Sequence, residues 1–312
     1  MHEPVLNQCP PSRVSSNDEC IAPASGASDA ALPVLPWNHL RQYTNLFLLS
    51  VRRWAFSGAC SRIMITLGLL PVFFIGLIAV MQILNNPAIN NNHVPHTELN
   101  TAFQMIFRTL YIHLIIFFGA SIFGFFILRK EVDDRTLHFL FLQPVRKAGV
   151  ILCRYAAFLA VTWPWLCLTF ILSYMMLFVP FGLKALSADL FVYGRALTLI
   201  KECLVMLLAL ALYAAVFMVA GSLFKTSWFI VVFYLWDTGV AYLPSFFKLF
   251  TISHYLQAVT PEKSALPTKL FELISQAPSP LQSLLTLVFM WIVLVSMAIV
   301  IIRQYECRYS GA

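Results

Sequence analysis

The chain has 312 residues, of which 60% are hydrophobic and only 11% are charged, whereas charged residues make up about 25% of ordinary soluble domains. So few charges cannot cover a water-soluble protein of this length, and several nearly uncharged stretches of helical length predict membrane spans. The composition therefore excludes a soluble globular protein. The net charge of +7 is typical of loops that contact anionic lipid, so we expect membrane lipids and no nucleic acid as partners.

Residues 1–36 are rich in Pro, Ser and Ala and show no helical or strand period. Such a segment has little apolar surface to bury, which predicts a flexible cytoplasmic tail. In residues 37–58, apolar side chains recur at helical spacing opposite Arg and Asn side chains. This pattern predicts an amphipathic helix that either lies in the lipid headgroup region or packs against its own protein.

Residues 59–312 contain six hydrophobic stretches, which predict an all-α polytopic membrane domain with six transmembrane helices. They are Ile63–Leu84, Ile106–Leu128, Tyr155–Val179, Cys203–Ser222, Ser227–Pro244 and Leu281–Ile302. About 20 helical residues cross a hydrocarbon layer of roughly 30 Å, and five of these stretches reach that length easily. The fifth stretch is the least typical, because it contains Asp237.

The distribution of Lys and Arg predicts the orientation of the spans, since cytoplasmic loops carry an excess of them. With a cytoplasmic N-terminus, 14 of the 21 Lys and Arg residues fall on the inside and 7 on the outside. The short loop at residues 129–147 contributes most to this difference. We therefore expect both termini to be cytoplasmic.

The loop at 129–147 has the sequence RKEVDDRTLHFLFLQPVRK. Its first half is charged, whereas its second half places Leu137, Leu140 and Phe141 on one face of a short helix that Pro144 ends. A helix of this kind either docks into a groove of a cytoplasmic partner or folds back on the bilayer or on its own bundle.

The run EVDDRTLHFLFLQPVRK resembles the signature of type-2 ABC exporter permeases. In that family an acidic residue, Gly-Thr-Leu, several leucines, Pro-Val and a basic residue form the helix between the second and third spans. The matching positions are Glu131, Thr136, Leu137, Leu140, Leu142, Pro144, Val145 and Arg146. Arg135 stands where the family usually has Gly. An N-terminal interfacial helix followed by six spans is also the layout of this family.

The resemblance implies a permease subunit of an ATP-driven exporter in the cytoplasmic (inner) membrane of a bacterium. Residues 131–146, with Phe141 on their apolar face, would be a coupling helix that a separate ABC ATPase subunit pushes. That partner would bind ATP and Mg, and a second copy of this permease or a related one would complete the assembly. The chain itself has no GxxxxGK[ST] phosphate-binding loop, and the nearest stretch, GSLFKTS at 221–227, lacks the second Gly.

Asp237 is the only acidic residue well inside a predicted span. Because intramembrane carboxylates are costly, they usually face a cavity or a partner. Asp237 is therefore either a polar point on the transport path or gate, or a capping residue where the fifth helix breaks near Thr238 and Gly239. The external loop at 245–280 holds short amphipathic stretches, which either form an outer gate, as the resemblance implies, or pack on the surface.

Other chemistry finds little support in the sequence. His93, His96 and Glu98 are too few and too loosely spaced for a zinc site, and no hydrolase arrangement of Ser, His and Asp is present, so we expect neither metal ligands nor catalytic residues. Two rival functions stay open. An ion-gradient-driven transporter would need paired charges within the spans, and a non-transporting anchor or regulator could keep the same fold. The substrate cannot be inferred.

Overall fold

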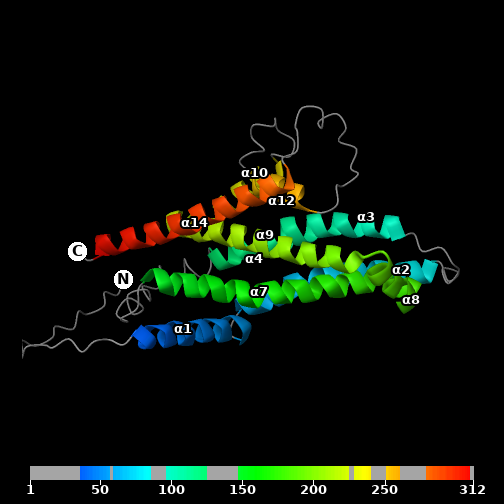
Figure 1. Cartoon of the computed structure of the whole chain (residues 1–312), viewed down its shortest axis with the longest axis horizontal. Coiled ribbons are helices and arrows are strands. Elements are labelled where there is room, and N and C mark those ends of the chain that lie inside the picture. Colours follow the sequence, from blue (N-terminus) through cyan, green and yellow to red (C-terminus); the bar gives the residue numbers. More distant parts are fainter. Residues whose placement is uncertain are drawn as a thin grey trace, which may run out of the picture.

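The structure, a computed structural model, describes residues 36–56, 59–85, 96–124, 147–224, 228–239, 251–260 and 279–309. Within these ranges the chain is almost entirely helical and contains no strand. The long helices run side by side along the longest axis of the molecule (Figure 1). The predicted all-α fold is thus confirmed. The predictions for the N-terminal tail and the coupling loop concern residues 1–35 and 125–146, which lie outside the described residues.

The helices follow one another in a simple order along the chain. They are α1 (Pro36–Phe56), α2 (Ala59–Asn85), α3 (His96–Ile106), η1 (Phe107–Ile116), α4 (Phe117–Ser121), α7 (Lys147–Phe178), η3 (Val179–Phe181), α8 (Leu183–Ser187), η4 (Ala188–Val192), α9 (Arg195–Leu223), α10 (Trp228–Gly239), α12 (Ile252–Val259) and α14 (Pro280–Tyr309). The elements α3, η1 and α4 form one continuous helical rod.

Five helical stretches are long and apolar enough to cross a membrane, which makes the chain an integral membrane protein. They are Arg62–Leu84, Leu99–Gly124, Gly149–Phe181, Arg195–Leu223 and Pro280–Ile301. The fifth predicted span, Ser227–Pro244, is represented by α10, which ends at Gly239 and is shorter than a full crossing. Its remaining residues lie outside the described ranges, so the count of six stays a prediction.

The sequence analysis placed the start of two spans too late. The second span begins near Leu99 instead of Ile106, and the fourth begins at Arg195 instead of Cys203. Both extensions contain charged or amide side chains that a hydropathy pattern assigns to loops. The helices nevertheless continue, because Gln104, Arg195 and Glu202 are buried against one another, as described below.

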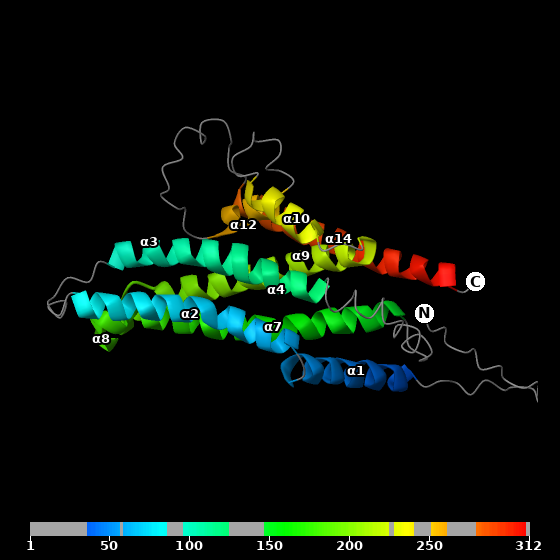
Figure 2. The ribbon, with the colours of Figure 1, turned by 180° about the vertical axis from the view of Figure 1, so that it is seen from behind.

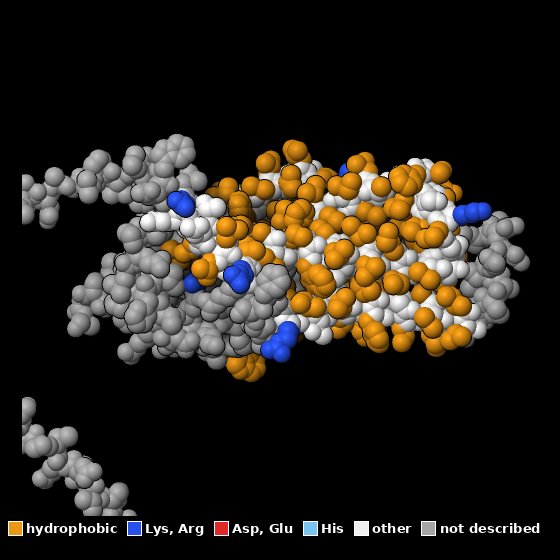
Figure 3. Space-filling model, turned by 90° about the horizontal axis from the view of Figure 1, so that it is seen from below, with side chains coloured by type: hydrophobic (Ala, Val, Ile, Leu, Met, Phe, Trp, Pro, Cys, Tyr) orange, Lys and Arg blue, Asp and Glu red, His pale blue; other side chains and the backbone are white. Residues whose placement is uncertain are grey.

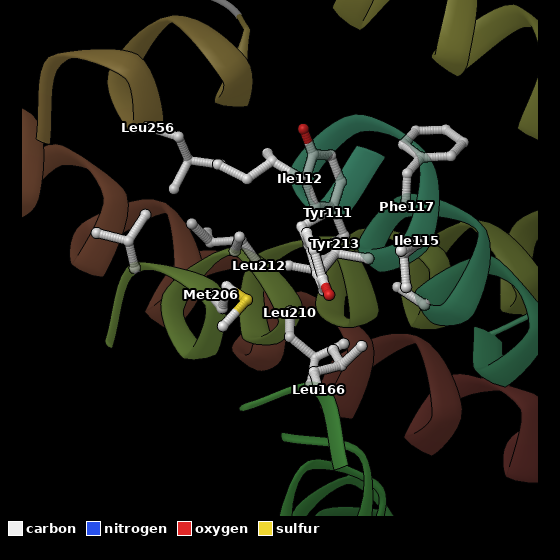
Figure 4. Close-up of a cluster of buried hydrophobic side chains, with 14 of the residues drawn as sticks. Tyr111, Ile112, Ile115, Phe117, Leu166, Met206, Leu210, Leu212, Tyr213 and Leu256 are labelled. Atoms are coloured by element: carbon white, nitrogen blue, oxygen red, sulfur yellow. The ribbon is translucent and has the colours of Figure 1, made fainter. Parts of the chain in front are cut away.

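The helix α9 forms the centre of the bundle. It packs against η1, α4, α7, α12 and α14, and 72% of its most apolar window is buried, compared with 17% for α14. Figure 4 shows how the core is assembled around it, with Tyr111 and Phe117 from the η1–α4 rod, Leu166 from α7 and Leu256 from α12 converging on α9. All four side chains are buried.

A hydrogen-bonded chain ties three of these helices together. The Tyr155 hydroxyl on α7 donates to the Ala211 carbonyl on α9 at 2.7 Å. It also accepts a hydrogen bond from the Trp291 indole on α14 at 2.8 Å. Because hydrocarbon offers no polar partners, such bonds satisfy groups that would otherwise be costly to bury, and they fix the lateral positions of the helices.

The outer surface of the bundle matches a lipid environment. Figure 3 shows one face covered by apolar side chains over its middle, with Lys and Arg mostly toward the margins. In both ribbon views, the start of α1 and the end of α14 lie at the same end of the bundle, and α8 lies at the opposite end (Figures 1 and 2). On the predicted orientation, the α8 end would be external.

The amphipathic helix α1 packs along the first part of α7. At this contact the backbone of Gly149 lies directly against the ring of Tyr43, since a Cβ at Gly149 would fall 2.4 Å from the Tyr43 Cε1. The neighbouring Cys153 thiol donates to the Tyr43 carbonyl at 4.0 Å. Leu48 and Leu49 on α1 are exposed. The helix therefore contacts its own protein, and its place in the lipid interface stays a prediction.

The close contact between Gly149 and Tyr43 yields a testable prediction. Gly149→Ala should lower the stability of the purified protein by about 1–3 kcal/mol, because the added methyl overlaps the ring and forces α1 away from α7. Thermal unfolding in detergent measures the loss. The matched control is Gly76→Ala in α2, where an added Cβ meets nothing within 4 Å. An equal effect of both substitutions would contradict the tight contact.

Candidate functional site

The predicted coupling residues lie outside the described residues. They are Glu131, Thr136, Leu137, Leu140, Phe141, Pro144, Val145 and Arg146. The structure does describe the two helices that carry this segment, since residues 125–146 connect the rod ending at Gly124 with the start of α7. The candidate coupling site can therefore be described through the contacts of the residues that flank it, at Gly124 and Gly149.

The end of the η1–α4 rod is in close contact with α9. A Cβ at Gly124 would lie 2.4 Å from the backbone carbonyl carbon of Phe217, a separation that no side chain could occupy without moving one of the helices. The Phe217 ring also meets Phe117 edge to face, with centroids 5.1 Å apart. A displacement of the chain at Gly124 would therefore act directly on the central helix.

The other end of the segment has an equivalent contact. Three residues into α7, Gly149 lies against Tyr43 of α1 at the separation described above. The two ends thus contact different parts of the molecule, the central α9 on one side and the N-terminal α1 on the other. A force on residues 125–146 would reach both at once.

Asp237 connects three helices inside the bundle. It lies near the end of α10 and is 2% exposed. Its Oδ2 accepts a hydrogen bond from the Tyr213 hydroxyl of α9 at 2.5 Å, and its Oδ1 accepts one from the backbone N–H of Ser253 in α12 at 3.3 Å. The Ser253 hydroxyl donates back to the Asp237 carbonyl at 2.9 Å.

This geometry bears on the two interpretations of Asp237. The described part of α10 ends at Gly239, and the carboxylate accepts a hydrogen bond from the Ser253 N–H in the first turn of α12. An acidic group at a helix N-terminus is favoured by the helix dipole. The Asp237 side chain is buried. Tyr213 lies about 15 Å along α9 from Leu223, at 1.5 Å per residue, so α12 is held at membrane depth.

A distorted helix lies beside Asp237. The element η1 is a π-helix of 10 residues, and π-helical segments are rare and often occur at functional sites. It carries His113, whose Nδ1 is buried and has no hydrogen-bond partner among the described residues. His113 interacts electrostatically with Asp237 and with Arg108. The π-helix therefore carries two basic side chains, Arg108 and His113, and His113 is close enough to Asp237 to interact with it electrostatically.

A second polar centre, absent from the sequence analysis, lies at the end of the bundle near α8. We call it the polar end cluster, and it consists of Gln104, Tyr174, Asp189, Arg195 and Glu202. All five side chains are buried. Gln104 donates to a carboxylate oxygen of Glu202, Arg195 forms an ion pair with the same oxygen at 3.6 Å, and Tyr174 donates to Asp189.

The polar end cluster brings together residues from four elements, namely α3, α7, η4 and α9. The sequence analysis had assigned Arg195 to a loop and had started the fourth span after Glu202. One signal was available, since Arg195 and Glu202 are seven residues apart and thus lie on one face of a helix. Their partners on α3 and η4 could not be inferred from spacing.

Metal chemistry has no conventional site in the described part of the chain. No group of three His, Cys, Asp or Glu side chains is placed to hold a metal ion there. His96 lies at the start of α3, and His93 lies outside the described residues. Comparisons of the chain with protein-family models, curated proteins and solved structures find no match.

The contacts of Asp237 predict what its removal does. Asp237→Ala leaves the Tyr213 hydroxyl and the Ser253 N–H without their acceptor, which should cost about 1–3 kcal/mol and loosen α12. Thermal unfolding in detergent measures this effect. The neighbouring control is Thr238→Ala, because the Thr238 hydroxyl bonds only within its own helix, to the Tyr234 carbonyl. A stable Asp237→Ala variant would show that the Asp237 carboxylate is not needed to hold α12.

Proposed function

We propose that this chain is the membrane-spanning permease subunit of an ATP-driven exporter and that a separate ABC ATPase engages its residues 131–146. The observation that carries the proposal is the run EVDDRTLHFLFLQPVRK, which has the acidic, Thr-Leu, leucine and Pro-Val-basic positions of the coupling helix of type-2 ABC exporter permeases. It lies between two of the five long apolar helices, where that family has it.

The contacts at the two ends of the segment support this role. A coupling helix must pass displacement on to the spans, and compliant ends would absorb it. Gly124 and Gly149 instead lie in backbone-to-neighbour contact with α9 and α1. Close-packed interfaces of this kind transmit movement because they cannot be compressed.

The energy source must lie in another chain. The sequence has no P-loop, so its backbone offers no cradle for ATP phosphates. The partner ATPase would bind ATP and Mg, and a second permease copy or a related permease would complete the unit in a bacterial cytoplasmic membrane. Within this unit, Asp237 would hold α12 as part of a gate, since it joins α12 to the central helix.

A second candidate function is an ion-gradient-driven transporter. The observation that favours it is the ion pair between Arg195 and Glu202, which lies within a span and is buried. The predicted fourth span, Cys203–Ser222, did not include either residue. Charges within spans often line ion pathways, and a transporter driven by an ion gradient would need no ATPase partner. Association with an ATPase therefore separates the two candidates.

The test uses the apolar face of the coupling segment. Leu137→Asp and Phe141→Asp should each release the ATPase that copurifies with the wild-type complex, by at least about tenfold, because a charge buried in a docking groove is costly. Affinity purification from membranes followed by mass spectrometry and ATPase assays measures the release.

The matched control is Phe139→Asp, since Phe139 would point to the other side of a helix that presents Phe141. Its complex should persist. Thermal unfolding of the isolated permease should be unchanged in all three variants. Retention of the ATPase by both Leu137→Asp and Phe141→Asp would refute docking through this helix, and the absence of any copurifying ATPase from the wild type would favour the second candidate.

A further inference from the structure

The polar end cluster contains a buried amide oxygen that has no hydrogen-bond partner among the described residues. Gln104 is 4% exposed, and its amide nitrogen donates to Glu202. Its amide oxygen, Oε1, is buried and has no hydrogen-bond partner among the described residues. A buried acceptor without a donor is costly, and such atoms in folded proteins usually indicate a bound water or ion.

A second buried oxygen of the same kind lies one helical turn away. The Oδ1 atom of Asn100 is also buried without a hydrogen-bond partner in the described part of the chain. Asn100 and Gln104 are separated by four residues on α3, so their side chains lie next to each other on one face of the helix. Two buried amide oxygens therefore belong to the face of α3 from which Gln104 reaches Glu202.

The charges around these oxygens favour a cation over an anion. The described residues of the cluster include two carboxylates, Asp189 and Glu202, and one guanidinium, Arg195. Tyr174 interacts electrostatically with all three, so they share one small region. The Arg195 guanidinium approaches Glu202 through Oε1, the same oxygen that Gln104 contacts.

We propose that Asn100, Gln104 and Glu202 bind a monovalent alkali-metal cation at the α8 end of the bundle. Oxygen donors suit hard cations, and amide carbonyl oxygens replace the hydration shell of alkali ions in selective channels. A divalent ion would need more carboxylates, because affinity for such ions rises with the charge of the ligands. The proposal concerns a structural ion and does not depend on the energy source of transport.

Such an ion would join α3 to α9 at this end of the bundle. Glu202 lies two turns into α9, and Gln104 lies in the last part of α3. The ion would give both buried amide oxygens a partner. Occupancy would then stabilise the arrangement in which the ends of α3, α7 and α9 are packed together.

The experiment compares the thermal unfolding of the purified full-length protein in NaCl, KCl and choline chloride at equal ionic strength. Choline is too large for the site, so NaCl or KCl should raise the Tm by roughly 5 °C over choline, as expected for a ligand well above its Kd. Radioactive Na⁺ should also bind saturably to the same preparation. Equal Tm values in all three salts would overturn the proposal.

Two variants locate the site. Gln104→Leu and Glu202→Gln should lose most of the difference between alkali salt and choline, whatever their absolute Tm. The control is Gln257→Leu on α12, an exposed position, which should keep the full difference. If Gln104→Leu does not fold, Asn100→Leu replaces it. The Asn100 side chain takes part in the proposed site through its amide oxygen, Oδ1, which the substitution removes. A full salt response in the site variants would show that the oxygens hold only water.

Discussion

The architecture depends on one constraint, namely that a polar group buried in a membrane bundle must find its partner within the protein. In this chain the central helix α9 provides most of these partners. Its Ala211 carbonyl receives the Tyr155 hydroxyl, its Tyr213 hydroxyl reaches Asp237, and its Glu202 carboxylate meets Gln104 and Arg195. The polar contacts therefore occur at several depths along a single rod, and they join α3, α7 and α10 directly to it.

The contacts of α9 also explain how distant parts of the molecule could act together. At one end of the bundle, Phe217 lies in backbone contact with Gly124, beside the segment that resembles a coupling helix. In the middle, Tyr213 holds α12 through Asp237. At the other end, Glu202 belongs to the polar end cluster. A small movement of α9 would change all three contacts, because rigid, close-packed helices do not absorb displacement.

The polar contacts differ in the free energy that their loss would cost, because some join neutral groups and others join charged groups. The Tyr155 chain joins neutral groups, and similar intramembrane hydrogen bonds contribute about 0.6 kcal/mol each. Asp237 and the Arg195–Glu202 pair involve charges, whose burial without partners costs several kcal/mol. The two charged centres, one at α12 and one near α8, are thus the contacts whose loss would destabilise the bundle most.

The sequence by itself determined the class of the protein and most of its spans. Hydropathy is a local property, so a stretch such as Ile63–Leu84 can be recognised without knowledge of its neighbours. The charged loop at 129–147 could be found in the same way. The coupling role of that loop follows from a resemblance, and it stays a prediction because the loop lies outside the described residues.

Only the tertiary structure decided where the second and fourth spans begin and what the buried charges contact. Hydropathy treats Gln104, Arg195 and Glu202 as helix-ending residues, because each is unfavourable in hydrocarbon when it is alone. In the bundle Gln104 and Arg195 both contact the Glu202 carboxylate, and the helices extend past them. The partners of Asp237 were equally beyond reach, since Tyr213 and Ser253 come from different helices. Pairing between distant residues is a property of the packed bundle, and no local pattern encodes it.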